Sequence, residues 1–210
     1  MKTACTGRMC PFSGALLLLI AVVAVGGLIV QAVQAKPVEA QVKPGDKMPE
    51  FTLNDIDGTE HSLEDFNGKV VVIAFSSQHC PWSRAADPAI SAIAEEYKEK
   101  GVVVLSIDSH NSTRPADIKE YAKGADLKQT ILKDEGNAYA DKVGATRTPE
   151  MFVLDKDHKI VYHGAFDNRK DPAETGETNY VRNALDSVLA GNPVDPAEVP
   201  GWGCGIKRAG

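Results

Sequence analysis

Two short apolar runs constrain the fold of this chain more than any other feature. The first is KVVVIAF at residues 69–75, and the second is VVVLSID at residues 102–108. Continuous β-branched runs of this kind form strands buried on both faces, usually in parallel sheets. Between them, apolar residues recur at three- and four-residue steps, which predicts a helix within 81–100: Ala86, Ile90, Ile93 and Tyr97. The order strand, helix, strand indicates an α/β fold with a parallel core.

The flanking segments predict further elements around this core. The pair Asp57-Gly58 is a hairpin-turn signal and predicts a β-hairpin within residues 51–66. Another strand pair, joined by a turn, is expected within 150–166, and it adds antiparallel strands to the sheet. Three more helices are expected at 115–126, 135–144 and 178–191. The result is a mixed central sheet flanked by helices and preceded by an N-terminal β-hairpin.

The first 35 residues have the layout of an export signal. Lys2 and Arg8 give a positive start, an apolar run occupies residues 14–30, and small residues end at Ala35. Two interpretations stay open: a signal peptide cleaved after Ala35, or an uncleaved anchor through residues 14–30. Both predict an extracytoplasmic protein, either periplasmic or secreted, with a membrane tether in the second case.

The remainder of the chain divides by composition. Residues 36–47 read as a linker, 48–191 as one domain, and 192–210 as a flexible tail that carries Cys204. The formal net charge is −6 and the pI is about 5.4, without the clustered Lys and Arg of a nucleic-acid binder. No nucleic-acid partner is therefore expected.

Cys80 lies where a strand passes into a helix, which is a favourable place for a reactive thiol. The unpaired N–H groups and the dipole of a first helical turn favour a thiolate, and they lower the pKa of cysteine from ~8.5. Pro81 suits that turn because it lacks an N–H. Trp82 is expected to shield the sulfur, and His79 to supply a positive charge or a hydrogen bond. The alternative is a buried structural cysteine.

Several motifs resemble the redoxin branch of the thioredoxin superfamily, which includes peroxiredoxins and membrane-tethered thiol-disulfide oxidoreductases. The resemblance covers about residues 43–208. It is carried by KPGDKMPEFTLNDIDGTEHSLEDFNGKVVVIAF, by SSQHCPWS, by RTPEMFVLD, and by VYHGAFDNR with the terminal GCGIKRAG. The HCP centre and the C-terminal GC-x-IK motif indicate a peroxiredoxin-like subgroup. The resemblance implies a thioredoxin-like fold in which Cys80 is the nucleophile.

The same resemblance implies a substrate groove. Pro149 is expected to be a cis-proline that lies opposite Cys80, with Arg147 and Thr148 at the groove. Thioredoxins carry a second cysteine three residues after the first, where this chain has Ser83. Peroxiredoxins carry Pro seven residues and Thr three residues before the reactive cysteine, where this chain has Ile73 and Ser77. Ser77 is expected to replace the Thr hydroxyl, and Arg147 lies near, but out of register with, the peroxide-polarising Arg.

Three functions remain open at this stage. The first is an exported oxidoreductase in which Cys80 attacks a peroxide or a protein disulfide, Cys204 captures the product, and an external thiol donates electrons. The second is a monothiol disulfide reductase or isomerase. The third is a non-enzymatic thioredoxin-like module that binds peptides. Cys204 is interpreted as a resolving, an idle or an intermolecular cysteine.

Other polar residues carry weaker signals. No cofactor and no metal site are expected, because the candidate ligands form neither a C-x₂₋₄-C pair nor an H-x₃₋₅-H spacing among themselves: Cys80, His79, His110 and His163. His61, His158 and His163 are expected to face solvent. The segment 167–169, Asp-Asn-Arg, is either a simple turn or a rim of the groove.

Overall fold

The computed structural model describes residues 41–208. The predicted signal or anchor at 1–35 lies outside the described residues, as do residues 36–40 of the predicted linker. Within the described range, no helix is both long enough and apolar enough to cross a membrane.

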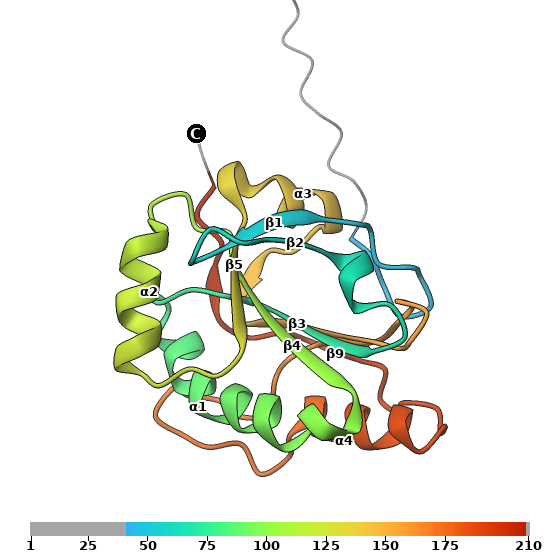
Figure 1. Cartoon of the computed structure of the whole chain (residues 1–210). Coiled ribbons are helices and arrows are strands. Elements are labelled where there is room, and N and C mark those ends of the chain that lie inside the picture. Colours follow the sequence, from blue (N-terminus) through green and yellow to red (C-terminus); the bar gives the residue numbers. More distant parts are fainter. Residues whose placement is uncertain (1–40, 209–210) are drawn as a thin grey trace, which may run out of the picture. The chain divides into compact units, whose positions relative to one another are not determined.

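An eight-stranded mixed sheet forms the centre of the domain, in the order β2-β1-β5-β4-β3-β7-β8-β9 (Figure 1). β3 (Val70–Ser76) and β4 (Val102–Asp108) pair in parallel, as the two apolar runs predict. β7 (Glu150–Leu154) pairs antiparallel with both β3 and β8 (Ile160–Gly164), which confirms the expected late strand pair.

The N-terminal hairpin is also present. β1 (Thr52–Asp55) and β2 (Glu60–Ser62) pair antiparallel around the predicted turn. A strand that the sequence pattern did not predict, β5 (Thr130–Lys133), joins this hairpin to β4. It was missed because it has only four residues and polar ends, so its hydrogen-bonding partners define it better than its composition does.

Within residues 41–208, four α-helices surround the sheet: α1 (Pro81–Glu96), α2 (Pro115–Gly124), α3 (Ala138–Val143) and α4 (Tyr180–Leu189). Three 3₁₀ turns supplement them: η1 (Leu63–Phe66), η2 (Lys98–Lys100) and η3 (Glu135–Asn137). In Figure 1, α1 and α4 lie below the sheet and α3 lies above it. The helix expected within 81–100 is thus α1 followed by η2, and Gly101 ends it with a φ of 80°.

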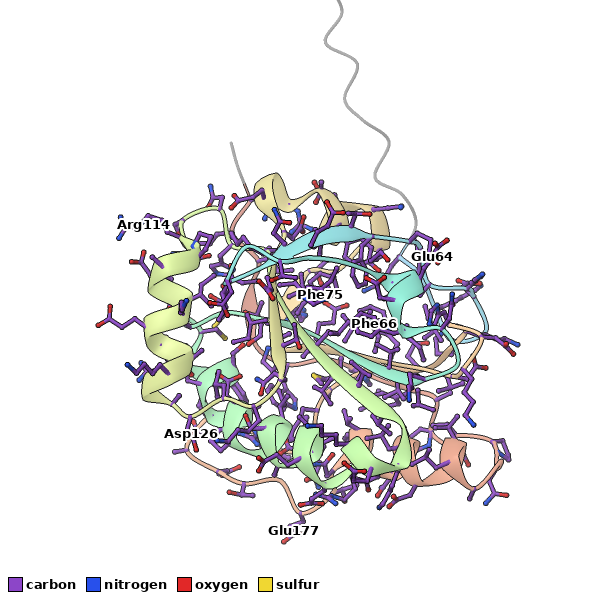
Figure 2. The ribbon with its side chains drawn as sticks, in the orientation of Figure 1. Glu64, Phe66, Phe75, Arg114, Asp126 and Glu177 are labelled. Atoms are coloured by element: carbon purple, nitrogen blue, oxygen red, sulfur yellow. The ribbon has the colours of Figure 1, made fainter. Side chains whose placement is uncertain are left out.

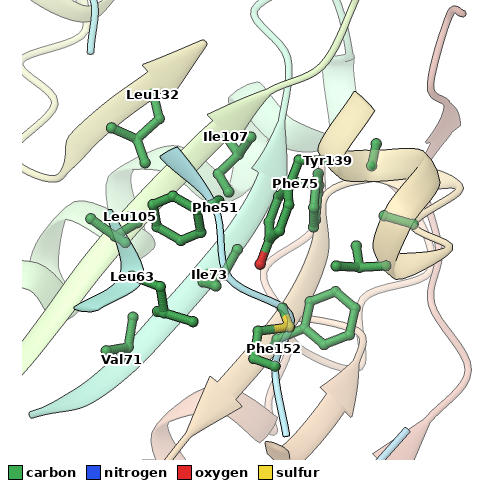
Figure 3. Packing of buried hydrophobic residues seen from close by; sticks show 14 of the residues in the cluster. Phe51, Leu63, Val71, Ile73, Phe75, Leu105, Ile107, Leu132, Tyr139 and Phe152 are labelled. Atoms are coloured by element: carbon green, nitrogen blue, oxygen red, sulfur yellow. The ribbon is translucent and has the colours of Figure 1, made fainter. Parts of the chain in front are cut away.

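β3 is buried on both faces, as a central parallel strand should be. Val71, Ile73 and Phe75 belong to the upper core with α3 and the hairpin (Figure 3). The alternate residues of β3 pack with apolar side chains of α1 and α4. At the surface, charged side chains such as those of Glu64 and Arg114 are exposed, whereas Phe75 lies inside (Figure 2).

The C-terminal segment differs from the flexible tail that its composition predicts. Its described residues, 192–208, form no helix, and they include two short strands that pair with the domain. β9 (Glu198–Val199) runs parallel to β8, and β10 (Cys204–Gly205) runs antiparallel to β6 (Arg147–Thr148). Ile206, next to β10, is buried in the upper core. The Pro- and Gly-rich composition of the segment allows extended pairing that a sequence pattern does not reveal.

Candidate active site at Cys80

Cys80 is the N-cap of α1, and Pro81 is the first residue of that helix. The Cys80 carbonyl accepts a hydrogen bond from the Arg84 N–H at 3.0 Å, while the Cys80 N–H donates to the Ser77 carbonyl at 3.0 Å. The residue is only 1% exposed. The local sequence therefore places Cys80 at a helix N-terminus, as predicted, and the surrounding fold buries it.

Ser83 occupies the position of the second thioredoxin cysteine, and its side chain forms a hydrogen bond within the loop before α1. Its side chain is fully buried, and its Oγ accepts a hydrogen bond from the Ser77 N–H at 3.3 Å. The Ser77 hydroxyl in turn accepts from the His79 N–H at 3.3 Å. Ser77 thus stabilises the loop before α1, and its hydroxyl is engaged there and not with the Cys80 sulfur.

The loop opposite Cys80 contains the predicted cis-proline. The Thr148-Pro149 bond is cis. The Thr148 carbonyl oxygen lies 2.9 Å from the Cys80 sulfur and accepts a hydrogen bond from the thiol. The predicted cis bond and its position facing Cys80 are therefore both confirmed.

The second thiol at the site is that of Cys204. In β10 it lies opposite Thr148 in the antiparallel register with β6. Its sulfur is 2.8 Å from the sulfur of Cys80, and both cysteines are free thiols. Two thiols separated by 124 positions are thus held side by side in the reduced protein. The tertiary structure thus places a second thiol beside Cys80, although the nearby position 83 is a serine.

The environment of Cys80 lowers the pKa of its thiol. Burial acts in the opposite direction and raises it, but hydrogen bonds to the sulfur outweigh that effect. The donors are the Cys204 thiol and the backbone N–H groups of Ser83 and Cys204. Hydrogen bonding to the charged form favours a thiolate at this position.

Cys204 behaves in the opposite way. Burial, the hydrogen bond to Cys80 and the negative charge that Cys80 acquires together raise the pKa of Cys204 to about 11. The backbone N–H of Trp82 and the charge of Lys207 oppose this rise only in part. The first proton therefore leaves Cys80, and Cys204 remains a thiol that donates to it.

An aromatic pair holds the segment before β10. The rings of Trp82 and Trp202 lie 5.0 Å apart between centroids, and the Trp202 indole N–H donates to the Asp167 carbonyl at 2.7 Å. The Arg169 guanidinium lies over the Trp202 ring and forms a buried two-pronged ion pair with the Asp167 carboxylate. Of the two interpretations of residues 167–169, this arrangement agrees with the rim of the site.

Glu150, which sequence reasoning missed, supports the cis-proline loop from behind. It is 3% exposed, and its carboxylate accepts hydrogen bonds from the backbone N–H groups of Thr146 and Arg147 at 2.8 and 3.0 Å. It also accepts from Gln41 at 2.8 Å and lies 2.9 Å from His163 Nε2. The available signal was an acidic residue at the start of an otherwise apolar strand.

Two of the predicted histidine environments are wrong. His158 and His163 are 2% and 7% exposed, whereas His61 is partly exposed. His163 is buried because it pairs with Glu150 and stacks on Phe152 at 4.4 Å between ring centroids. These rings were expected outside because they lie on predicted strands or turns, but polar partners in the folded chain bury them: Phe66 for His158 and Glu150 for His163.

The remaining predicted site residues contribute less direct contacts. The side chains of His79 and Arg147 are exposed, and neither is hydrogen-bonded to the Cys80 sulfur in the described part of the chain. Pro81 is exposed beside the site. No group of three or more potential metal ligands occurs among residues 41–208.

A family model described as Redoxin matches residues 43–181. The chain belongs to the redoxin family. A curated relative of this redoxin is thiol-disulfide oxidoreductase ResA from Bacillus thuringiensis subsp. konkukian. It is 29% identical over 159 residues, which cover 76% of this chain and 90% of ResA. Chloroplastic peroxiredoxin Q from Gentiana triflora is 33% identical over 146 residues, which cover 65% of this chain and 66% of the relative.

Solved structures agree with this assignment. A hypothetical protein from Sinorhizobium meliloti 1021 superposes with a TM-score of 0.75 and 28% identity, covering 81% of this chain and 97% of that protein. The fold of this redoxin is therefore thioredoxin-like, with a mixed sheet between helices, as predicted. Its relatives include both thiol-disulfide oxidoreductases and peroxiredoxins.

Proposed function

We propose that this redoxin is a dithiol oxidoreductase that cycles between Cys80 and Cys204 thiols and a Cys80–Cys204 disulfide. The separation of 2.8 Å between the two sulfurs is the observation that supports this most directly. A disulfide requires about 2.05 Å between sulfurs, so the bond forms with little movement of the backbone. Cys204 then acts as the resolving cysteine that the loop at Ser83 lacks.

The reaction begins at Cys80, because a thiolate is the attacking species. With a disulfide RSSR, the Cys80 sulfur bonds to one sulfur and RS⁻ leaves. Cys204 then attacks the Cys80 sulfur, a second thiol RSH is released, and the Cys80–Cys204 disulfide remains. With a hydroperoxide ROOH, Cys80 becomes a sulfenic acid and ROH leaves, and attack by Cys204 releases water. Either route oxidises two thiols and reduces one oxidant by two electrons.

An external thiol donor completes the cycle. It attacks the disulfide, forms a mixed disulfide, and is displaced as its own oxidised form while both cysteines return to thiols. The lowered pKa of Cys80 makes it the better leaving group in this step. The donor is therefore expected to bond first to Cys204, the more exposed sulfur.

Two features bear on the choice of oxidant. The Ser77 hydroxyl is engaged in its own loop, and the exposed Arg147 side chain runs beside Gly201. The Ser77 hydroxyl is thus engaged in its loop and the Arg147 side chain is exposed, which favours disulfide exchange as the main reaction. Peroxide reduction is the second candidate, supported by the kinship with peroxiredoxin Q.

We also propose that the domain acts outside the cytoplasm. The charged start, the apolar run at 14–30 and the small residues up to Ala35 support export, with or without a retained anchor. An oxidising compartment suits a protein that carries a labile disulfide.

Mass spectrometry after one equivalent of oxidant tests the cycle. The reduced protein is treated with hydroxyethyl disulfide or with hydrogen peroxide, alkylated and digested. We expect a Cys80–Cys204 link within the monomer. In Cys204→Ser, the expected product is instead a mixed disulfide on Cys80 with hydroxyethyl disulfide, or a sulfenic acid on Cys80 with hydrogen peroxide. Equal accumulation of those products in both proteins would overturn the role of Cys204.

A further inference from the structure

The edge of β6 beside Cys80 is already paired. β6 and β10 form a separate two-stranded sheet, with Cys204 opposite Thr148 and Gly205 opposite Arg147. Extended peptides often bind a protein by adding a strand to a free sheet edge. Here the protein's own C-terminal segment takes that place, and it brings a cysteine directly to the nucleophile.

The residue before Cys204 packs tightly against β6, whereas the residue after it has free space beside it. A Cβ atom at Gly203, where φ is +127°, would lie 2.1 Å from the Thr148 carbonyl oxygen. A Cβ atom at Gly205 would meet nothing within 4 Å. The path beside β6 therefore accepts a cysteine preceded by glycine, and it does not accept a segment with a side chain at that position.

The segment is held on both sides of β10. Before it, the Trp202 indole N–H donates to the Asp167 carbonyl at 2.7 Å. After it, the Ile206 N–H donates to the Thr146 carbonyl at 3.0 Å, and the Asn111 N–H donates to the Lys207 carbonyl at 3.1 Å. The Ile206 side chain is 8% exposed. Removing β10 from β6 breaks these contacts together.

We propose that β10 is a built-in occupant of the β6 edge, which restricts the oxidant of Cys80 to small molecules and excludes disulfides carried on extended protein segments. The proposal rests on the proposed function and names its substrate class. Cys80 is 1% exposed, and its sulfur lies 2.8 Å from that of Cys204, which is itself partly exposed. A low-molecular-mass disulfide or a hydroperoxide needs only local movement around Cys204 to reach the sulfur. A protein strand needs β10 to leave.

The first bond-forming step tests this without involving Cys204. In the Cys204→Ser background, the Cys80 thiolate attacks a disulfide RSSR, forms Cys80–S–S–R and releases RS⁻, and nothing resolves the adduct. The rate of adduct formation is measured by mass spectrometry with hydroxyethyl disulfide and with insulin. In a third arm the oxidant is hydrogen peroxide, which converts Cys80 to a sulfenic acid. Mass spectrometry distinguishes this product from the mixed disulfide formed with hydroxyethyl disulfide.

Two glycine variants in that background supply a matched pair. Gly203→Ala places a methyl group against Thr148 and pushes β10 off β6, whereas Gly205→Ala places one in open space. Trp202→Ala is a second way to release the segment, because it removes the indole anchor. Thermal unfolding of each protein verifies that the domain remains folded.

We expect the Cys204→Ser protein to react with insulin at least about 10²-fold more slowly than with hydroxyethyl disulfide, since the strand edge is blocked. Gly203→Ala and Trp202→Ala should raise the insulin rate by about tenfold or more, and Gly205→Ala should leave it within about threefold. Similar rates for insulin and the small disulfide in Cys204→Ser would overturn the proposal. So would insulin rates that neither releasing variant changes. The proposed cycle is tested separately, since it fails only if wild-type oxidation yields no Cys80–Cys204 disulfide.

Discussion

Two parts of the site contact the Cys80 sulfur, the first turn of α1 and the β6–β10 pair, and they differ in how far from Cys80 they lie in the sequence. The first turn of α1 is adjacent to Cys80 in sequence, and it supplies the Ser83 N–H. The β6–β10 half supplies Thr148 and Cys204, and Cys204 lies 124 positions away. One half of the nucleophile's environment is thus local, and the other depends on the complete fold. Damage to the second half should therefore leave a reactive but unresolved thiol.

Each half also has a buried carboxylate behind it, and the two respond differently to burial. Glu150, behind β6, accepts from two backbone N–H groups and two side chains. Burial raises its pKa, but the bonds from His163 and the two backbone N–H groups outweigh burial and lower it. Asp87, within α1, has a hydroxyl bond from Tyr121 at 2.6 Å and a longer one from Ser76 at 3.5 Å. Burial dominates there and raises the pKa of Asp87 to about 6. The number of donors decides the direction.

The largest effects should separate the two cysteines. Cys80→Ser removes the nucleophile, so turnover with any oxidant should fall by about 10³-fold or more. Cys204→Ser removes only resolution, so steady-state turnover should fall by about tenfold or more while the first stoichiometric attack persists. Steady-state assays and single-turnover mass spectrometry measure the two quantities. Equal loss of the first attack in both variants would show that the halves are not separable.

The two thiols should also differ in pKa, with that of Cys80 lowered and that of Cys204 raised. Alkylation rate against pH should place the midpoint of Cys80 below the ~8.5 of free cysteine, because hydrogen bonds to the sulfur favour the thiolate. The midpoint of Cys204 should lie near 11 in the wild type, as its environment raises the pKa to about 11. In Cys80→Ser it should fall, because the neighbouring charge is gone. An unchanged Cys204 midpoint would contradict the coupling of the two sulfurs.

The same division explains what the sequence could predict. The strands at 69–75 and 102–108, the helix after Cys80 and the cis-proline loop follow from local patterns and from the family resemblance. The docking of β10 does not, because two residues within a Pro- and Gly-rich segment carry no periodicity. Its position depends on the Trp202 anchor and on the burial of Ile206, which are contacts between distant parts of the chain.

The role of Glu150 was hidden for a related reason. A glutamate at the start of a strand is usually exposed. Only the folded loop shows that four donors converge on this carboxylate. The expectation that His163 faces solvent was wrong for the same reason, since nothing in the sequence around a strand histidine indicates a buried acidic partner.

Glu150→Gln should weaken the β6 half by destabilising the loop. The amide has one acceptor oxygen for four donors, so its NH₂ group faces N–H groups. We expect the free energy of unfolding to fall by about 3 kcal/mol. Disulfide formation between Cys80 and Cys204 should slow in parallel. Glu198→Gln is the matched control, since that carboxylate lies 3.7 Å from the other His163 nitrogen and its side chain is 63% exposed.

The control should change stability by less than about 0.5 kcal/mol. Chemical denaturation measures the free energy of unfolding, and the rate of disulfide closure after one equivalent of oxidant measures the alignment of the site. If Glu150→Gln and Glu198→Gln behave alike, then the buried carboxylate does not hold the loop.

The smallest expected effect concerns Asp87, and its sign is opposite to that of Glu150. The pKa of Asp87 is raised to about 6 in the folded protein, against ~3.9 in an unfolded chain. Between these values the folded state keeps a proton that the unfolded state has released, so the contribution of Asp87 to stability falls as pH rises from about 4 to about 6. Asp87→Asn removes this loss, and the amide oxygen still accepts the Tyr121 hydroxyl. The variant should therefore be more stable than the wild type by about 1–3 kcal/mol at pH 7, and nearly equal to it at pH 4. Denaturation curves at the two pH values measure the difference, and a gain that is the same at both would show that Asp87 is already ionised and satisfied in the fold.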